Sequence, residues 1–98
     1  MDNKKEIEKI KKKIIPILKK HKVTRAGIFG SYARGEQKKE SDVDILIEIN
    51  DSVGLTGLIE LKLNLEKQVK RKVDIVEYST IRRELREFIL GDEIPLKL

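Results

Sequence analysis

The sequence contains no cysteine, no tryptophan and a single histidine, His21. Without cysteine there is no disulfide scaffold, no cysteine-based zinc site and no thiol nucleophile, and one histidine cannot form a histidine-rich metal site. Apolar runs are only a few residues long, and the N-terminus lacks an apolar signal segment. We therefore expect neither membrane insertion nor export, and a cytoplasmic location.

The chain is short and basic. Its 98 residues suffice for one small hydrophobic core, so we expect a single domain over residues 1–98 and a substrate that supplies part of any active site. Lysine and arginine number 22 against 17 aspartate and glutamate, which gives a net charge of +5. Because the two signs are interspersed, we interpret this charge as a solvated surface and expect no nucleic-acid partner.

Three segments carry apolar residues at helical spacing. The first contains Pro16, which removes a backbone donor, so we expect a kink or a second helix start there. All three should pack against a core, and Ser79 or Thr80 is expected to cap the third. The apolar positions are Ile7, Ile10, Ile14, Ile17 and Leu18 in the first segment, Leu55, Leu58, Leu61, Leu65 and Val69 in the second, and Ile81, Leu85, Phe88 and Ile89 in the third.

Residues 23–29, 42–49 and 73–76 are predicted to be strands. Alternation along 42–49 places Val43 on one face and both Asp42 and Asp44 on the other. The alternation of helices and strands predicts an α/β or α+β fold, with a small twisted mixed sheet of three or more strands covered by about four helices. Parallel pairing is expected where a helix crosses between two strands.

Gly30 and Ser31 lie at a predicted strand-to-helix turn. The missing side chain of glycine would let a phosphate approach the backbone, and the serine adds a hydroxyl donor. An isolated Gly-Ser pair is nevertheless more typical of an ordinary helix cap. The pair therefore points to phosphate binding only in combination with other residues.

Two carboxylates follow on one strand face, since alternate residues Asp42 and Asp44 lie about 7 Å apart. Two such charges repel each other unless a hard cation lies between them, and Mg²⁺ typically binds one or two carboxylates together with phosphate oxygens. A lone Asp-x-Asp pair is more often part of a solvated face. The pair thus needs support from a further ligand.

Asp74 interrupts an apolar run, where a buried carboxylate requires a partner. That partner is either a structural arginine such as Arg71 or Arg25, or a cation shared with the Asp pair. In the second case, the three carboxylates could hold two cations for in-line displacement at phosphorus.

The spacing Gly30-Ser31, ten residues, Asp42-Val43-Asp44 reproduces a signature of the DNA polymerase β-like nucleotidyltransferase superfamily. The strings GIFGSYARGEQKKESDVDILIEI, VDIVE and REFILGDEIPL resemble the minimal nucleotidyltransferase family over about residues 5 to 97. Single-domain members of that family are typically antitoxins encoded beside a helical HEPN-domain ribonuclease. The resemblance implies the polymerase β-like fold and ATP-dependent transfer of AMP to a tyrosine of the toxin.

The resemblance also implies roles for individual residues. Gly30 and Ser31 would bind the terminal phosphates of ATP, and Asp42 and Asp44 would be ligands in a two-metal Mg²⁺ site. Asp74 corresponds to the third carboxylate, a metal ligand that also orients or deprotonates the attacking hydroxyl. The expected catalytic residues are therefore Asp42, Asp44 and Asp74.

Arg34 follows in the next turn, where its guanidinium is suited to a phosphate oxygen and equally to an ion pair with Glu36. Tyr32 and Tyr78 could stack on adenine, although packing in the core is the more usual role for such residues. Excess apolar residues near the C-terminus, such as Phe88, suggest a protein interface, with core packing again the more usual explanation.

Two other functions stay open. One is a binding-only antitoxin with a vestigial nucleotide site, whose mark in the sequence would be a lost aspartate. The other is a small-molecule nucleotidyltransferase, a class that usually carries an extra domain to close the acceptor pocket. The three aspartates and the short chain favour the protein adenylyltransferase over both.

Overall fold

Four strands form one mixed sheet in the order β3-β2-β1-β4 in the computed structural model, which describes residues 3–38 and 41–98. The central strand β1 (Val23–Phe29) pairs antiparallel with β2 (Val43–Ile49) and with β4 (Ile94–Leu96). β2 pairs parallel with β3 (Val73–Glu77), as expected for two strands joined by a crossover helix.

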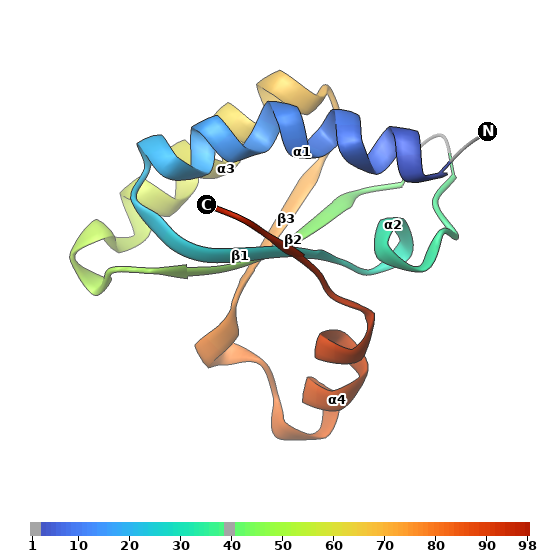
Figure 1. Ribbon diagram of the computed structural model, residues 1–98. Helices are drawn as coiled ribbons and strands as arrows, with labels where there is room; N and C mark the ends of the chain where they lie inside the picture. Colours follow the sequence, from blue (N-terminus) through green and yellow to red (C-terminus); the bar gives the residue numbers. More distant parts are fainter. Residues whose placement is uncertain (1–2, 39–40) are drawn as a thin grey trace.

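The helices lie on both faces of this sheet (Figure 1). α1 (Asn3–Lys20) and the crossover helix α3 (Gly54–Val69) lie side by side over one face, and α4 (Arg83–Asp92) lies over the other. The short helix α2 (Ser31–Arg34) follows β1, and two 3-10 turns, η1 (Asp51–Val53) and η2 (Tyr78–Thr80), precede α3 and α4. This architecture confirms the predicted mixed α/β fold with a small sheet and about four helices.

The alternation of β2 determines which side chains each face buries. Val43, Ile45 and Ile47 are fully buried in the main core beneath α1 and α3, where each large aliphatic side chain contributes about 1.5–3 kcal/mol. Leu46 points to the opposite face and is buried in a smaller cluster with Tyr78 and Ile81, against which part of α4 packs. Asp44 shares that second face. No helix in the described part of the chain is long and apolar enough to span a membrane.

The expected second helix start at Pro16 is wrong, because α1 continues through this residue to Lys20. Pro16 is exposed, so its missing donor lies on the solvent side, while Ile14 and Leu18 on the inner face are fully buried. Packing of that apolar face on the sheet outweighs the local cost of the proline.

Leu55 was also expected in the core but is 73% exposed. At 100° per residue it lies about 120° around α3 from Leu61, which is fully buried. Of the other apolar residues of α3, Leu65 is fully buried and Val69 is 8% exposed. Leu55 therefore starts a second apolar face rather than extending the first.

The predicted caps of α4 are wrong. Arg82 is the N-cap residue, and no side chain caps the helix. The Thr80 hydroxyl donates instead to the Glu77 carbonyl oxygen and closes the preceding 3-10 turn. At the other end of the sheet, the Asn50 side chain accepts a hydrogen bond from the Ser52 backbone N–H, 2.9 Å away, and caps η1.

Both tyrosines lie in the protein interior. Tyr78 donates a hydrogen bond to the Glu93 carboxylate, and the Arg25 guanidinium lies 4.1 Å from the centre of its ring. The Glu93 carboxylate covers Gly27 of β1, where a side chain would overlap it. Tyr32 is fully buried, and its hydroxyl makes no hydrogen bond of good geometry. Burial raises the pKa of both tyrosine hydroxyls.

These two tyrosines form a matched pair for a stability measurement. Tyr78→Phe should reduce the free energy of unfolding by about 1–2 kcal/mol, because it leaves the part-buried Glu93 carboxylate without this donor. Tyr32→Phe should change it by less than about 0.5 kcal/mol, because the Tyr32 hydroxyl lies near Glu6 but makes no hydrogen bond of good geometry. Urea unfolding followed by circular dichroism measures both, and equal losses would contradict the assignment.

Candidate active site

The parallel register of β2 and β3 places Asp44 directly opposite Asp74. Neighbouring strands are about 4.8 Å apart, so the two residues are adjacent on the sheet face that also carries Leu46. Asp42 immediately precedes β2 and lies two residues before Asp44, which places it on the same side. The structure thus brings together the three carboxylates that the sequence suggested.

Asp44 is the point where this negative charge converges. Its burial, followed by the nearby carboxylates of Asp74 and Asp42, raises the pKa of its side chain from 3.8 to about 6, and the Arg34 guanidinium opposes the rise. Burial and the neighbouring carboxylates both disfavour the ionised form of the Asp44 side chain. A bound cation would relieve them.

Gly30 forms the wall of this carboxylate cluster. It adopts a positive φ of 75°, which L side chains rarely tolerate, and a Cβ at this position would overlap the Asp44 carboxylate. Phe29, just before it, is the partner of Asp44 in the β1–β2 ladder. Gly30 is the N-cap residue of α2 and Ser31 its first residue, so Ser31 itself does not occupy the cap position. The Gly-Ser turn therefore lies against the carboxylates.

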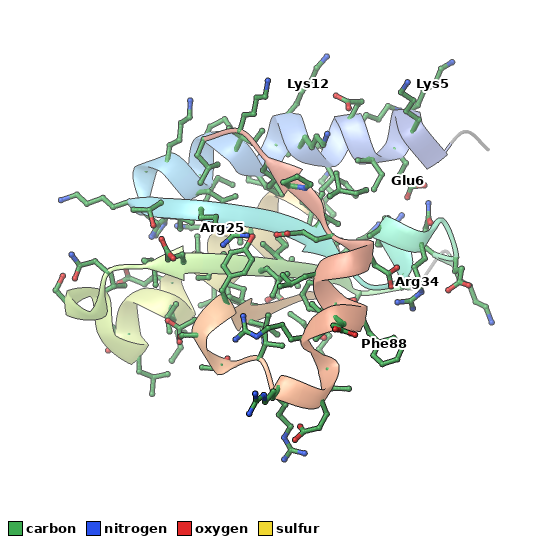
Figure 2. The ribbon with its side chains drawn as sticks, turned by 60° about the horizontal axis from the view of Figure 1, so that its bottom comes forward. Lys5, Glu6, Lys12, Arg25, Arg34 and Phe88 are labelled. Carbon is green, nitrogen blue, oxygen red and sulfur yellow. The ribbon has the colours of Figure 1, made fainter. Side chains whose placement is uncertain are left out.

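Arg34, which is labelled in Figure 2, also acts on Asp44, because its guanidinium lowers the pKa of that carboxyl group. Its Nε donates to Glu36 Oε1 at 2.7 Å, which is the ion pair considered from the sequence. Its Nη1 also lies 3.5 Å from Asp92 Oδ2 at the end of α4, a partner that the sequence analysis missed. The sequence feature that could have identified Asp92 as a partner is its position in the last turn of α4. A carboxylate there is unfavourable unless a cation compensates it.

The donor set fits Mg²⁺. Among residues 3–38 and 41–98, no group of three or more histidine, cysteine, aspartate or glutamate side chains is placed so that it could hold a metal ion. Mg²⁺ does not require one, because it usually binds one or two carboxylates and takes its remaining oxygens from phosphates and water. Asp42 and Asp44, with the repulsion evident at Asp44, provide such an incomplete set.

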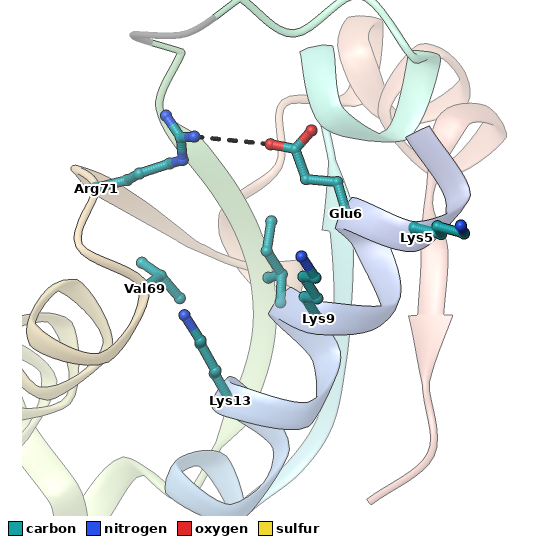
Figure 3. Close-up of a pocket in the computed structure, with 7 residues that line it drawn as sticks. Lys5, Glu6, Lys9, Lys13, Val69 and Arg71 are labelled. Atoms are coloured by element: carbon teal, nitrogen blue, oxygen red, sulfur yellow. Dashed lines mark ion pairs between the residues drawn. The ribbon is translucent and has the colours of Figure 1, made fainter. Parts of the chain in front are cut away.

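The arginines considered as structural partners of Asp74 lie elsewhere. Arg25 lies over the Tyr78 ring, and an Arg71 nitrogen lies 3.7 Å from a Glu6 carboxylate oxygen. Figure 3 shows this ion pair at a basic hollow of about 380 Å³ between α1 and the end of α3. Lys5, Lys9 and Lys13 of α1 line the same hollow.

Asp74 instead lines a different hollow, of about 360 Å³, at the edge of the sheet. Leu55, Leu58 and Ile59 of α3 form one side of it, and β3, including Val76, forms the other. Of the three aspartates only Asp74 borders this hollow, whose lining also includes Lys62, Glu77 and Thr80.

The raised pKa of Asp44 predicts that the free energy of unfolding depends on pH. In the folded state its pKa is about 6 instead of 3.8, so the side chain favours folding only while protonated, and stability is lost as the pH rises from about 4 through 6. When a chelator removes divalent cations, the Asp44→Asn variant should be more stable than the native protein at pH 7.5 by about 1–2 kcal/mol. This value allows for the partial exposure of the Asp44 side chain.

Urea unfolding at pH 7.5 and pH 4 measures this difference, which should be several-fold smaller at pH 4. Glu48→Gln, at an exposed position of the same strand, is the matched control and should show no such pH dependence. A difference that is independent of pH would contradict the assignment.

Comparison with known protein families gives a match to the model for polymerase beta nucleotidyltransferases over residues 12–97. A Methanocaldococcus jannaschii protein named as a protein adenylyltransferase is 49% identical over 90 residues, which cover 92% of this chain and 97% of that protein. The protein adenylyltransferase MntA of Thermococcus cleftensis is 38% identical over 72 residues, covering 74% of this chain and 73% of that one.

Solved structures show the same relationship. A structure described as a minimal nucleotidyltransferase superposes with a TM-score of 0.81 at 33% identity, covering 98% of this chain and 97% of the other. A crystal structure of a toxin-antitoxin with AMP-PNP superposes with a TM-score of 0.77 at 27% identity, covering 89% and 72%. The chain therefore belongs to the polymerase beta nucleotidyltransferase family, as a minimal nucleotidyltransferase related to the protein adenylyltransferases.

Proposed function

We propose that this protein is a Mg²⁺-dependent protein adenylyltransferase that transfers AMP from ATP to a tyrosine of a cognate HEPN-domain ribonuclease toxin and so acts as its antitoxin. The observation that carries the proposal is the convergence of Asp42, Asp44 and Asp74 beside the Gly30–Ser31 turn. The adenylyltransferase relatives support the reaction, and the toxin-antitoxin structure with AMP-PNP supports the nucleotide and the class of partner.

In this proposal the Gly30–Ser31 turn binds the nucleotide. The absence of a side chain at Gly30 leaves the backbone accessible beside Asp44, and the Ser31 hydroxyl donates to a phosphate oxygen. Arg34 exchanges its exposed contacts with Glu36 and Asp92 for the triphosphate, which its planar guanidinium matches well. Asp42 and Asp44 would hold Mg²⁺, which when bound would supply neutralisation of the phosphate charge.

Asp74 acts on the acceptor. Its carboxylate accepts a hydrogen bond from the tyrosine hydroxyl and takes up the proton as the phenolic oxygen forms a bond to the α-phosphorus. The bond from the α-phosphorus to the oxygen that bridges it to the β-phosphorus breaks, and pyrophosphate leaves on the opposite side. The product is a tyrosine carrying AMP, and no covalent intermediate with the enzyme is required.

Incubation with ATP, Mg²⁺ and the protein encoded by the neighbouring gene tests this reaction. Intact mass spectrometry should detect an adenylyl increment on the partner, which the Asp42→Asn/Asp44→Asn variant fails to produce. The Glu48→Gln variant, altered on the same strand, should retain the activity. Absence of the increment, while the two proteins still co-purify and the partner stays inhibited, would favour the binding-only antitoxin.

Asp74→Asn separates the role of this residue from nucleotide binding. It should reduce the rate of transfer by about 10²–10⁴-fold, since the amide cannot accept the hydroxyl proton. The KM for ATP should change much less, because Gly30, Ser31 and Arg34 are unaltered. Steady-state kinetics measured against both substrates provides the test. A large rise in the KM for ATP with an unchanged kcat would instead assign Asp74 to nucleotide binding.

A further inference from the structure

Helix α1 carries the excess positive charge of the protein. It contains eight lysines and two glutamates, a net charge of +6. The rest of the chain holds the other 14 of the 22 lysines and arginines and the other 15 of the 17 acidic residues, so it is slightly negative. The other two long helices show no such bias, because α3 has two lysines and two glutamates, and α4 has two arginines and three acidic residues. The two signs are therefore separated in the fold rather than interspersed, as was expected from the sequence.

The lysines of α1 lie mostly on the side of the helix that points away from the sheet. Ile7, Ile10, Ile14 and Leu18 are buried against the core. At 100° per residue, six lysines lie within about 75° of the direction opposite to this buried side. These six residues, all exposed, are termed the lysine face: Lys5, Lys9, Lys12, Lys13, Lys19 and Lys20. Figure 2 shows two of them, Lys5 and Lys12, extending outward from the helix.

Part of the lysine face borders a hollow to which a second element adds positive charge. Lys5, Lys9 and Lys13 line the hollow of about 380 Å³ together with Arg71, which follows α3 (Figure 3). Glu6 is the one acidic residue in the described lining, and it pairs with Arg71. Within the described ranges, the three lysines make no ion pair. The mutual repulsion of these cations would be relieved by a bound anion.

We propose that the lysine face binds the phosphate backbone of a double-stranded nucleic acid. The 18 residues of α1 span about 27 Å, which matches about eight successive phosphates of one strand at about 3.4 Å each. A row of charge of this length suits a polyanion better than a single phosphate group. Helix α1 has no aromatic residue on which an unpaired base could stack, so the contacts are to the backbone and are independent of base sequence.

A membrane surface matches this helix less well. A basic helix that binds a membrane does so by burying an apolar face among the lipids. The apolar face of α1 already belongs to the protein core, where Ile14 and Leu18 are fully buried. It is therefore not available for insertion.

An acidic protein also matches the lysine face less well. Protein interfaces are enriched in arginine and aromatic residues and depleted in lysine. Helix α1 has eight lysines and neither an arginine nor an aromatic residue. Lysine binds phosphate as a point charge, which is sufficient for contacts that follow a backbone without reading its sequence.

The proposal does not depend on the adenylyltransferase activity. Helix α1 covers the core face of the sheet, whereas Asp44 lies on the opposite face with Leu46. A duplex bound to the lysine face therefore leaves the carboxylate cluster accessible.

Fluorescence anisotropy tests the proposal with labelled RNA and DNA duplexes of the same sequence, each about 20 base pairs long. Titrations between about 50 and 200 mM KCl, in EDTA to exclude metal bridging at the aspartates, give the salt dependence of the affinity. Contacts from all six lysines should make the logarithm of the association constant fall against that of the salt concentration with a slope of about −5.

The Lys5→Gln/Lys9→Gln/Lys13→Gln variant removes half of the lysine face. It should reduce the steepness of this slope by about 3 and weaken binding at least tenfold at about 0.1 M KCl, because three phosphate contacts are lost. Its melting temperature should stay close to the native value, since all three side chains are exposed.

The matched control is the Arg82→Gln/Arg83→Gln/Arg86→Gln variant. It removes the same charge from three exposed positions at α4, over the other face of the sheet. Its affinity for either duplex should stay within about twofold of the native value, because these arginines lie outside the lysine face.

The two duplexes distinguish the sources of the backbone. Binding of both supports recognition of any duplex, and binding of one alone supports the proposal and identifies RNA or DNA as the ligand. Absence of binding to both at about 50 mM KCl would overturn the proposal. Equal losses in the lysine and arginine variants would also overturn it, because net charge alone would then explain the affinity. Tighter binding of labelled polyglutamate than of either duplex would assign the lysine face to an acidic protein instead.

Discussion

The parallel pairing of β2 with β3 is the constraint on which the rest of the site depends. It places Asp44 opposite Asp74 on one face of the sheet and, by the same register, Val43 opposite Val73 on the other. Because side chains alternate strictly along a strand, a shift of one residue would move the carboxylates into the core and the aliphatic residues out of it. Burial of Val43, Ile45 and Ile47 beneath α1 and α3 therefore also fixes the position of the carboxylates.

The carboxylate cluster is an unfavourable arrangement that the fold maintains. A Cβ at Gly30 would overlap the Asp44 carboxylate, and the burial and two acidic neighbours of Asp44 raise its pKa. Such a concentration of like charge reduces the stability of the protein without ligands. In the proposed function the same arrangement is useful, since it is prepared for a cation and the triphosphate that the cation accompanies.

Polar contacts attach the C-terminal segment to the rest of the fold. Tyr78 bonds to Glu93, which covers Gly27, and Arg34 reaches Asp92 at the end of α4. These contacts hold the C-terminal segment near the Gly-Ser turn, so α4 and the residues proposed to bind the nucleotide form one region of the molecule. In contrast, the flank formed by α3 and β3 has an apolar surface that the chain itself leaves exposed.

Particular residues show how far the sequence could be interpreted. The alternation of residues 42–49 was sufficient to predict β2 and its two faces, because a period of two is a local property of the chain. Pro16 was misinterpreted because packing of Ile14 and Leu18 outweighs a local helix-breaking tendency. Leu55 was misassigned because apolar spacing along a helix does not distinguish a face buried in the core from one that stays exposed.

The sequence by itself determined the family, the mixed α/β fold, and the spacing of Gly30, Ser31, Asp42 and Asp44, since these are properties of residue identity and local periodicity. Only the tertiary structure decided that Asp74 lies beside Asp44, that Asp92 contacts Arg34, and that Asp74 and Leu55 border the same hollow. The reason is that each of these contacts joins residues far apart in the chain, and strand pairing and helix packing alone bring them together.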